Sequence, residues 1–335
     1  MPALPPVARC VAIEAEGGHR QGLPDADPPS LAARRRRGWA GGVGAEVQAA
    51  RRAGHARARE ARSLKRAGAF AGAVATAGLS WAWFEAGWVR LRTREVGIAR
   101  LPEELDGIRV AHLSDFHLGV PSRGSHAARR AVEWVRERRP ELVCVTGDLV
   151  SRPRGEPSLR ALLHDLGDAY VVLGNHDVEH SRDPFSRSAG LTDLSPAHLL
   201  VDEGATVDIR GNRVQIVGVD PRAYRQGSSR PWELVDERAD LRILLCHFPY
   251  VLDFLPPGAF DLVLSGHMHD GQISLPLGRR RKYRFAHPNT RYAVGLYGRP
   301  AATMHVSPGL GTTFVPFRFF ARPEATELVL QTPRE

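Results

Sequence analysis

From residue 108 onward, short apolar runs alternate with polar and amphipathic segments. Each run is long enough for one strand, and they fall at 108–114, 141–146, 169–174, 213–219, 241–246, 261–265 and 302–306. Their nearly continuous apolar character is typical of strands that are buried on both faces. The pattern therefore predicts an α/β protein in which helices cover the sheets.

Amphipathic segments lie between several of these runs and predict the helices. We expect helices over 125–139, where Pro140 ends the pattern, and over 157–166, 189–203 and 230–239. Upstream, residues 89–96 alternate polar and apolar side chains, which indicates a half-exposed strand. No internal repeat is visible, so the strands and helices belong to one α/β unit.

The first 66 residues differ in composition from the rest of the chain. They are rich in Pro, Gly, Ala and Arg and contain few large apolar residues. Such a segment buries too little apolar surface to offset the entropy lost on ordering it. We expect residues 1–66 to form a disordered basic tail with a short helix near 45–65.

Residues 67–84 carry no charged side chain and predict a transmembrane helix. Lys65 and Arg66 precede them, and Trp81, Trp83 and Trp88 cluster at the far end. A span needs about 20 apolar residues, and cations on one flank with tryptophans at the interface are typical of one. The alternatives are an Ala/Gly-rich packing helix or a cleaved signal sequence.

The distribution of charge indicates where the chain meets its partners. Residues 1–66 hold 13 of the 46 Lys and Arg but only 6 of the 37 Asp and Glu, so most of the net charge of +9 lies there. Cations placed before a membrane segment predict an inside N-terminus and an extracytoplasmic domain. A domain at the cytoplasmic face and a soluble protein are the alternatives. The nearly neutral remainder argues against a nucleic-acid-binding domain.

Polar clusters follow five of the predicted strands directly. They are Asp115-Phe116-His117, Gly147-Asp148, Gly174-Asn175-His176-Asp177, His247 and Gly266-His267-Met268-His269. In α/β sheets, ligands bind at the carboxyl ends of strands, so these side chains are expected to converge on one crevice. Singly, each motif is an ordinary turn, cap or surface histidine. Five in succession indicate a functional site.

The donor types in these clusters predict a metal centre. Carboxylates packed together repel one another once they leave water, and divalent cations remove that penalty. Carboxylate, imidazole and amide donors without a thiolate suit Mn, Fe or Zn. Seven ligands exceed the needs of one tetrahedral zinc but suit two divalent metals that share a bridging carboxylate. Cys144 and Cys246 lie in apolar runs and are expected to be reduced, buried thiols.

The ordered motifs resemble those of the calcineurin-like metallophosphoesterase superfamily. The matching sequences are DFH at 115–117, GD at 147–148, GNHD at 174–177, the isolated His247 and GHMH at 266–269. SDFHLG, LSGHMHDGQ and SPGLG are similar to a bacterial, membrane-associated subgroup with GHTHGGQ motifs. The resemblance implies a four-layer α/β/β/α sandwich, with two mixed sheets flanked by helices, over residues 85–332.

The resemblance also implies roles for individual residues. One metal would be held by Asp115, His117, Asp148 and His269, and the other by Asp148, Asn175, His247 and His267. His176 would be the catalytic histidine. The implied enzyme is a metal-dependent phosphoesterase that hydrolyses phosphomonoesters or phosphodiesters with a metal-bridging hydroxide.

Two positions depart from the pattern of the superfamily. Ser151 stands where many members have an Asp that orients the catalytic histidine, so we expect His176 to be held less firmly or by another group such as Asp177. Asp270 replaces the usual small residue after GHxH. It is expected either to accept a hydrogen bond from a ligand histidine or to face solvent.

One basic cluster, Arg279, Arg280, Arg281 and Lys282, follows the last motif closely. We interpret it as a candidate substrate-binding segment for an anionic headgroup, with a solvated loop as the alternative. The substrate class stays open between general phosphoesters, lipid-linked substrates and UDP-sugar pyrophosphates. A nuclease and a catalytically weak, metal-bound binding protein are the rival functions.

Overall fold

The computed structural model describes residues 42–178, 181–278 and 282–332. The chain divides into two compact units, Met1–Ala69 and Phe70–Glu335. All of the strands and the candidate site belong to the second unit, which also contains the last part of the first helix.

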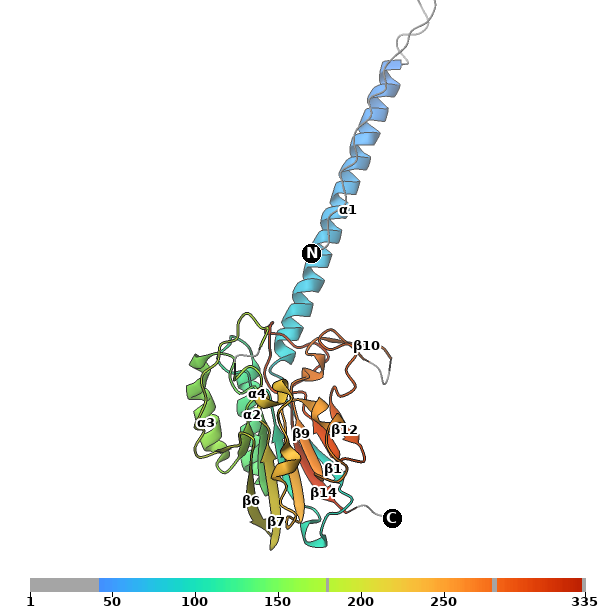
Figure 1. Ribbon diagram of the computed structural model, residues 1–335. Coiled ribbons are helices and arrows are strands. Elements are labelled where there is room, and N and C mark those ends of the chain that lie inside the picture. Colours follow the sequence, from blue (N-terminus) through green and yellow to red (C-terminus); the bar gives the residue numbers. More distant parts are fainter. Residues whose placement is uncertain (1–41, 179–180, 279–281, 333–335) are drawn as a thin grey trace, which may run out of the picture. The chain divides into compact units, whose positions relative to one another are not determined.

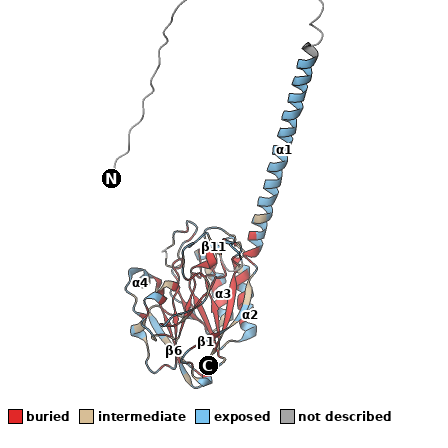
Figure 2. Ribbon diagram, turned by 90° about the vertical axis from the view of Figure 1, so that its right-hand side faces the viewer, coloured by how far each residue is buried: buried red, intermediate tan, exposed pale blue. Residues whose placement is uncertain are grey.

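Helix α1 is one continuous element from Gly42 to Glu85. It covers the segment 67–84 that we expected to span a membrane and also residues 42–66, which the composition had assigned to a tail with only a short helix. The remainder of that tail, residues 1–41, lies outside the described residues. Within α1, Ala45–Glu85 qualifies by length and composition as a candidate span, with only 6% of its most apolar window buried. Figure 2 shows its exposed surface in pale blue.

The first sheet has six strands in the order β1-β14-β2-β3-β4-β5. Their bounds are Arg90–Gly97, Glu324–Gln331, Arg109–Leu113, Leu142–Thr146, Tyr170–Val172 and His198–Leu199. Strands β2, β3 and β4 run parallel to one another, whereas β14 is antiparallel to β2 and parallel to β1. The carboxyl ends of β2, β3 and β4 therefore lie at one edge of the sheet (Figure 1).

The second sheet also has six strands, in the order β12-β13-β9-β8-β7-β6. Their bounds are Gly295–Gly298, Thr303–Val306, Leu262–Ser265, Leu241–Leu245, Asn212–Gly218 and Glu203–Ile209. Strands β7, β8, β9 and β13 are parallel, and the two outer strands are antiparallel to their neighbours. This arrangement places the carboxyl ends of β8 and β9 side by side.

Three apolar clusters hold the layers together. Helices α2 (Gly124–Arg138) and α3 (Glu156–Leu166) pack on the outer face of the first sheet. A second cluster fills the space between the sheets and includes Val110 and Cys144 on one side and Ile243 on the other. The third covers the outer face of the second sheet with short helical segments, among them Pro249–Asp253. The predicted fold class, two mixed sheets flanked by helices, is confirmed.

Two predicted helices are wrong. Residues 189–203 contain only β5 and the start of β6 within an irregular segment, and Pro196 in the middle of that segment lacks the N–H that a helix interior needs. Residues 230–239 form a single short helical turn, Pro231–Leu234. In both segments, spaced apolar side chains pack on a sheet without a helix. The other short elements include α4 (Pro221–Gln226), a hairpin of β10 (Ser274–Pro276) and β11 (Lys282–Arg284), and single helical turns at Glu103–Leu105, Pro153–Gly155 and His269–Gly271.

The two described cysteines are free and buried, as the sequence predicted. Burial raises the pKa of both Cys144 and Cys246 to about 12. At pH 8, only about 10⁻⁴ of each thiol would then be thiolate, which is the reactive form. We expect a Cys10→Ser variant to resist alkylation by iodoacetamide until it is unfolded. Labelling of the native variant within minutes, measured by mass spectrometry, would contradict this.

Candidate metal centre

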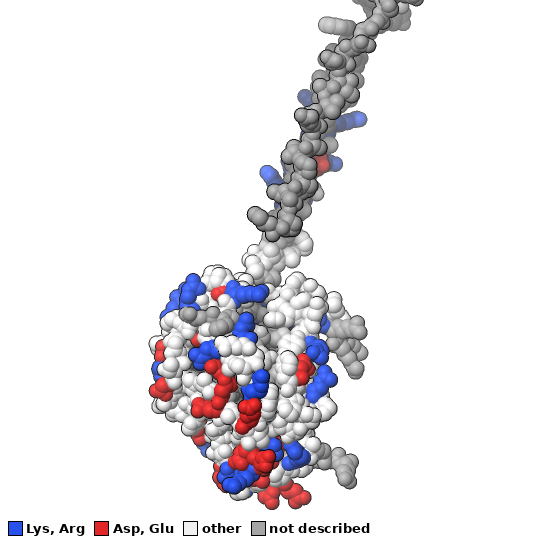
Figure 3. All heavy atoms as spheres, in the orientation of Figure 1, with Lys and Arg blue, Asp and Glu red and all other residues white. Residues whose placement is uncertain are grey.

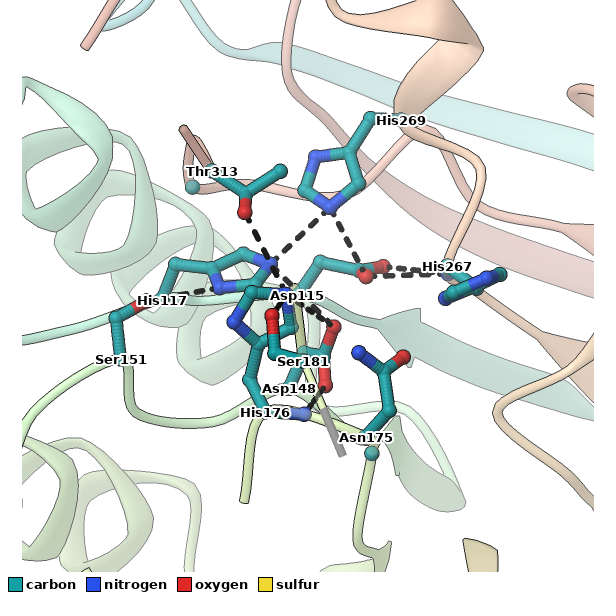
Figure 4. Close-up of polar contacts among 12 residues, drawn as sticks. Asp115, His117, Asp148, Ser151, Asn175, His176, Ser181, His267, His269 and Thr313 are labelled. Carbon is teal, nitrogen blue, oxygen red and sulfur yellow. Dashed lines mark hydrogen bonds and ion pairs between the residues drawn. The ribbon is translucent and has the colours of Figure 1, made fainter. Parts of the chain in front are cut away.

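The candidate site lies where the carboxyl ends of strands from both sheets meet. Asp115 and His117 follow β2, Asp148 follows β3, and Asn175 and His176 follow β4 in the first sheet. His247 follows β8, while His267 and His269 follow β9 in the second sheet. Side chains that are up to 154 positions apart in the sequence thus point toward one another (Figure 4).

Much of this site stands on strained backbone. Five of its residues adopt left-handed φ values between 47° and 73°, namely Asp115, His117, Asp148, His267 and His269. Residues other than glycine rarely adopt such values, which cost about 1–3 kcal/mol each and cluster at functional sites. Gly266 is needed for a different reason, because a Cβ there would collide with Asp115 Oδ2. The backbone conformation that orients these side chains toward the site therefore lowers the stability of the fold.

The first group of donors contains Asp115, His117, Asp148 and His269. One ligand atom from each lies within 4.8 Å of all the others, and all four residues are buried. His269 Nε2 is 3.3 Å from Asp115 Oδ1 and 3.1 Å from His117 Nε2. His117 Nε2 is 3.5 Å from Asp148 Oδ2. This group could hold one cation.

The second group consists of Asp148, His247 and His267, which meet the same distance limit. His247 Nε2 lies 3.2 Å from Asp148 Oδ2 and 3.2 Å from His267 Nδ1. Asn175 Oδ1 is a further 3.2 Å neighbour of His247 Nε2. Asp148 therefore belongs to both groups, and the structure brings together all seven side chains that the sequence singled out as ligands.

The hydrogen bond on the far side of His247 tests whether a cation fits. Its Nδ1 lies 2.8 Å from Thr146 O, a carbonyl that can only accept, so Nδ1 carries a hydrogen. The lone pair of a neutral His247 would then face the oxygens of Asp148 and Asn175, which are also acceptors. A proton or a metal ion at this point removes that conflict. The donor set and the orientation of His247 both fit a divalent metal.

Ionisation of the site reflects the same crowding. Burial disfavours the charged form of His247, but Asp148 and Asp115 outweigh burial and raise its pKa to about 9. Burial, reinforced by nearby His247, lowers the pKa of His267 to about 3. The pKa of His247 is therefore raised, whereas that of its neighbour His267 is lowered. His267 thus keeps the lone pair that a metal ligand requires.

His176 lies beside the two groups and is oriented by hydroxyl groups. Its Nδ1 is 3.0 Å from Ser186 Oγ, and its Nε2 is 3.0 Å from Ser181 Oγ and 3.4 Å from Thr313 Oγ1. Its backbone N–H donates to Asp148 Oδ1 at 2.8 Å. Burial is the main influence that lowers the pKa of His176.

The expectation that Asp177 holds the His176 ring is wrong. The Asp177 carboxylate instead accepts hydrogen bonds from the backbone N–H groups of Leu149, Val150 and Gly174. It thereby fastens the turn that carries Asp148 to the turn that carries Asn175 and His176. The Asp177 carboxylate is needed as an acceptor by the backbone N–H groups of these turns. The His176 ring therefore contacts serine hydroxyls instead.

The two departures from the superfamily pattern have structural roles. Ser151 Oγ lies 2.9 Å from His117 Nδ1, so it supports a candidate ligand (Figure 4). Asp270 is buried and forms ion pairs with Lys282 Nζ at 2.5 Å and Arg284 Nε at 2.9 Å. Neither of the two expected positions for Asp270, on a ligand histidine or in solvent, is correct. The carboxylate fixes the β10–β11 hairpin to the loop of the site.

The predicted substrate-binding cluster is described only in part. Arg279, Arg280 and Arg281 lie outside the described residues. Lys282 is engaged by Asp270 and also donates to Phe320 O at 2.7 Å. In this structure, the ammonium group of Lys282 therefore supports the hairpin.

The sequence did not reveal Arg318, a fully buried cation next to the site. Its Nη2 lies 3.2 Å from His269 Nδ1, and its other donors bind Gly311 O and Ala321 O. Nor did it single out Ser181, Ser186 or Thr313. Isolated Arg, Ser and Thr residues carry no spacing signal, and only the loops of the folded chain bring them to the site.

A cavity of about 520 Å³ opens onto the site. Its lining includes Asn175, His176, His267 and His269. Arg182 and Arg225 supply cationic groups, and Phe285, Phe314 and Val315 supply an apolar part. The cavity thus combines the candidate metal groups with positive charge and apolar surface.

Comparisons with known proteins agree with this site. The family model described as Calcineurin-like phosphoesterase matches residues 108–271, which contain all seven candidate ligands and His176. A transmembrane protein with metallophosphoesterase domain from Danio rerio is 31% identical over 259 residues, and the match covers 71% of this chain. The chain spans only 56% of that relative.

One further relative has a similar description. The uncharacterized metallophosphoesterase YkuE of Bacillus subtilis is 26% identical over 285 residues, with 79% of this chain and 94% of the relative covered. Among solved structures, a dimetal phosphatase from Danio rerio matches at 14% identity with a TM-score of 0.37, covering 61% of this chain and 88% of that one. By its sequence motifs and the matching family model, the chain contains a domain of the calcineurin-like phosphoesterases, a family of metal-dependent phosphoester hydrolases.

Proposed function

We propose that the chain is a dinuclear, metal-dependent phosphoesterase that hydrolyses phosphomonoester or phosphodiester bonds. Asp115, His117, Asp148 and His269 would hold one divalent metal. The second would be held by Asp148, Asn175, His247 and His267. Mn, Fe and Zn all suit these donors.

The observation that carries this proposal is the shared position of Asp148. Its Oδ2 faces His117 and His247, which belong to different groups, at 3.5 and 3.2 Å. A carboxylate between two donor groups is the arrangement that a two-metal site requires. A single metal held by the first group would leave Asn175, His247 and His267 without a cation.

The reaction follows from the groups around the cavity. Two bound cations would acidify a water molecule and neutralise charge that develops on the phosphoryl group. We assign His176 as the catalytic histidine, because its Nε2 is the ring nitrogen close to the cavity-lining Ser181 and Thr313. When protonated, it would donate to a phosphoryl oxygen or to the departing alkoxide. The negative charge of a bound phosphate favours that protonated form.

We also propose that α1 anchors the enzyme in a membrane, with residues 85–332 as the catalytic domain. The candidate span within Ala45–Glu85 supports this, as does the name of the Danio rerio relative. Cations such as Lys65 and Arg66 precede the apolar part, which favours a catalytic domain on the extracytoplasmic side.

A metal-supplemented screen tests the proposed activity. The chelator-stripped full chain is assayed with 4-nitrophenyl phosphate and bis(4-nitrophenyl) phosphate, each with Mn, Fe or Zn. We expect turnover to need added metal and to fall by at least about 100-fold in Asn175→Ala and His267→Ala, since each loses a candidate ligand. His126→Ala, on the exposed side of α2, is the matched control. A binding protein without turnover would bind metal but release no nitrophenol with any of these metals.

A further inference from the structure

Exposed apolar side chains lie on the segments that border the site cavity. We call this set the apolar rim; it consists of Phe185, Leu275, Leu277, Tyr283, Phe285, Phe314, Val315 and Phe320. Leu277 is 60% exposed and Phe314 51% exposed, although both are large apolar residues. The rim comes from three separate segments, of which the β10–β11 hairpin and residues 314–320 are hydrogen-bonded to each other through Ser274 and Phe319.

The rim borders two cavities that share a wall. The site cavity contains Phe285, Phe314 and Val315 together with the candidate ligands. A second cavity of about 260 Å³ has an apolar wall that includes Val120, Phe185 and Pro316, and Arg152, Arg154 and Asp183 also line it. Thr313, Phe314 and Val315 line both cavities. An apolar space therefore adjoins the place where the phosphoryl group would bind.

The same segment connects the rim to the end of α1. The Arg318 backbone N–H donates to Ala82 O at 3.1 Å, and the rings of Trp83 and Phe317 are 6.2 Å apart. Ala321 N donates to Glu85 Oε1 at 2.8 Å. Within the second unit, the apolar end of the helix and the rim thus lie at the same end of the body (Figure 1). On the face drawn in Figure 3, the lower end of the helix is white, and both white residues and a few charged ones lie on the body next to it.

Aromatic side chains extend this surface along the helix. Trp81, Trp83, Phe84 and Trp88 are all exposed by more than a third. Tryptophans in such positions are typical of the boundary between lipid and water. Large apolar patches on a soluble surface are unfavourable and mark sites that another apolar phase covers. Since the rim continues the end of the candidate span, the bilayer itself is the phase that fits.

We propose that the apolar rim lies in the membrane interface and that the substrate is a lipid phosphoester drawn from the bilayer. Its phosphate would bind at the metal centre, and part of its hydrocarbon chain would follow the apolar wall into the second cavity. This inference rests on the proposed phosphoesterase function. It selects a membrane-resident substrate over soluble phosphoesters and soluble nucleotide sugars.

Matched pairs of substrates test the inference with the full chain, loaded with metal and reconstituted in phosphatidylcholine vesicles. The diester pair is methyl and hexadecyl 4-nitrophenyl phosphate, and the monoester pair is glycerol 3-phosphate and dioleoyl phosphatidic acid. Within each pair, the same type of phosphoester bond is hydrolysed, and the two substrates differ mainly in the hydrocarbon chain. We expect kcat/KM to be at least about tenfold higher for the chain-bearing member of the pair that the enzyme accepts.

Variants of the apolar rim show whether the enzyme recognises the hydrocarbon chain of the substrate, or whether enzyme and substrate merely concentrate in the same vesicle. Leu277→Ser and Phe320→Ser keep α1 and line neither cavity. In the double variant, the ratio of kcat/KM for the chain-bearing substrate to that for the short-chain substrate should fall by about tenfold. The reason is that polar side chains weaken the insertion of the rim into the membrane interface. The matched control is Leu234→Ser, an exposed apolar residue whose carbonyl is bound by Gln215 of β7. It should leave the ratio unchanged.

The outcomes distinguish this inference from the proposed function. Equal kcat/KM for both members of the accepted pair would overturn the lipid substrate while leaving the phosphoesterase intact. A ratio that the rim variants do not change would also overturn it, and would leave a protein partner or a second copy as the occupant of the rim. No metal-dependent turnover of any of these substrates would overturn the proposed function itself.

Discussion

Asp148→Asn is expected to abolish metal-dependent turnover, with kcat/KM falling about 10³-fold or more, or roughly 4 kcal/mol of transition-state stabilisation. Asp148 is the only candidate ligand placed in both donor groups among the described residues. Removing its charge weakens both proposed metal sites at once, whereas every other ligand variant leaves one site with all its donors.

The substitution is chosen to keep the fold. Asn is isosteric with Asp, and its carbonyl oxygen can still accept the backbone N–H of His176, which binds Asp148 Oδ1 in the native chain. Its amide nitrogen would face His247 Nε2 and donate to it in place of a cation. The variant should therefore fold without metal but bind metal poorly.

Thermal unfolding with and without metal checks this. A ligand at 100 times its Kd stabilises the native state by about 2.7 kcal/mol, so the wild-type melting temperature should rise on adding Mn. Asp148→Asn should lose most of that rise. Asp193→Asn is the control, because Asp193 is an exposed carboxylate that accepts hydrogen bonds from Ser195. A full rise in melting temperature for Asp148→Asn would show that Asp148 does not hold the metals.

Strands could be predicted well from the sequence because burial on both faces leaves a continuous apolar run. The runs at 108–114, 141–146 and 241–246 correspond to β2, β3 and β8. Edge strands such as β6 and β12 carry a weaker signal, because one side of each is exposed. Helices at 189–203 and 230–239 were wrong because apolar spacing alone does not distinguish a helix from an irregular segment packed on a sheet.

The candidate ligands could be predicted because each follows a strand directly, where the topology brings strand ends together. Their supporting residues could not. Ser186 and Arg318 reach the site through loops whose paths depend on tertiary packing, and their residue types are common everywhere. Sequence reasoning offered Asp177 as one group that could hold His176, whereas Asp177 accepts hydrogen bonds from three backbone N–H groups instead.

Arg318→Met is expected to weaken the metal site by way of His269. Arg318 is 0% exposed, its guanidinium donates to Gly311 O and to Ala321 O, and its Nη2 lies against the His269 ring, 3.2 Å from Nδ1. Met fills similar space but supplies no donor. Two buried carbonyls lose partners, at about 1–3 kcal/mol each, and the His269 ring loses the contact that orients it. Loss of such an outer contact typically costs 10–100-fold in metal affinity.

Metal stoichiometry separates this effect from general destabilisation. Elemental analysis should show selective loss of the metal that His269 helps to hold, so Arg318→Met should retain closer to one metal per chain where the wild type binds two. Arg322→Met is the matched control, because Arg322 lies in the same segment, stacks 3.5 Å from the Trp88 ring and donates to Trp88 O. It should lower stability and leave metal content intact.

The comparison of these two arginines also tests how the anchor and the site are linked. Arg322 contacts Trp88 and Val89, which follow the end of α1, whereas Arg318 touches both α1 and the site, through its backbone N–H to Ala82 and its side chain to His269. If metal content falls equally in both variants, the segment transmits any disturbance at α1 to the centre. If metal content falls only in Arg318→Met, the guanidinium itself positions His269. Arg318→Lys should then restore little of the lost metal, because one ammonium group cannot replace the planar set of donors of a guanidinium.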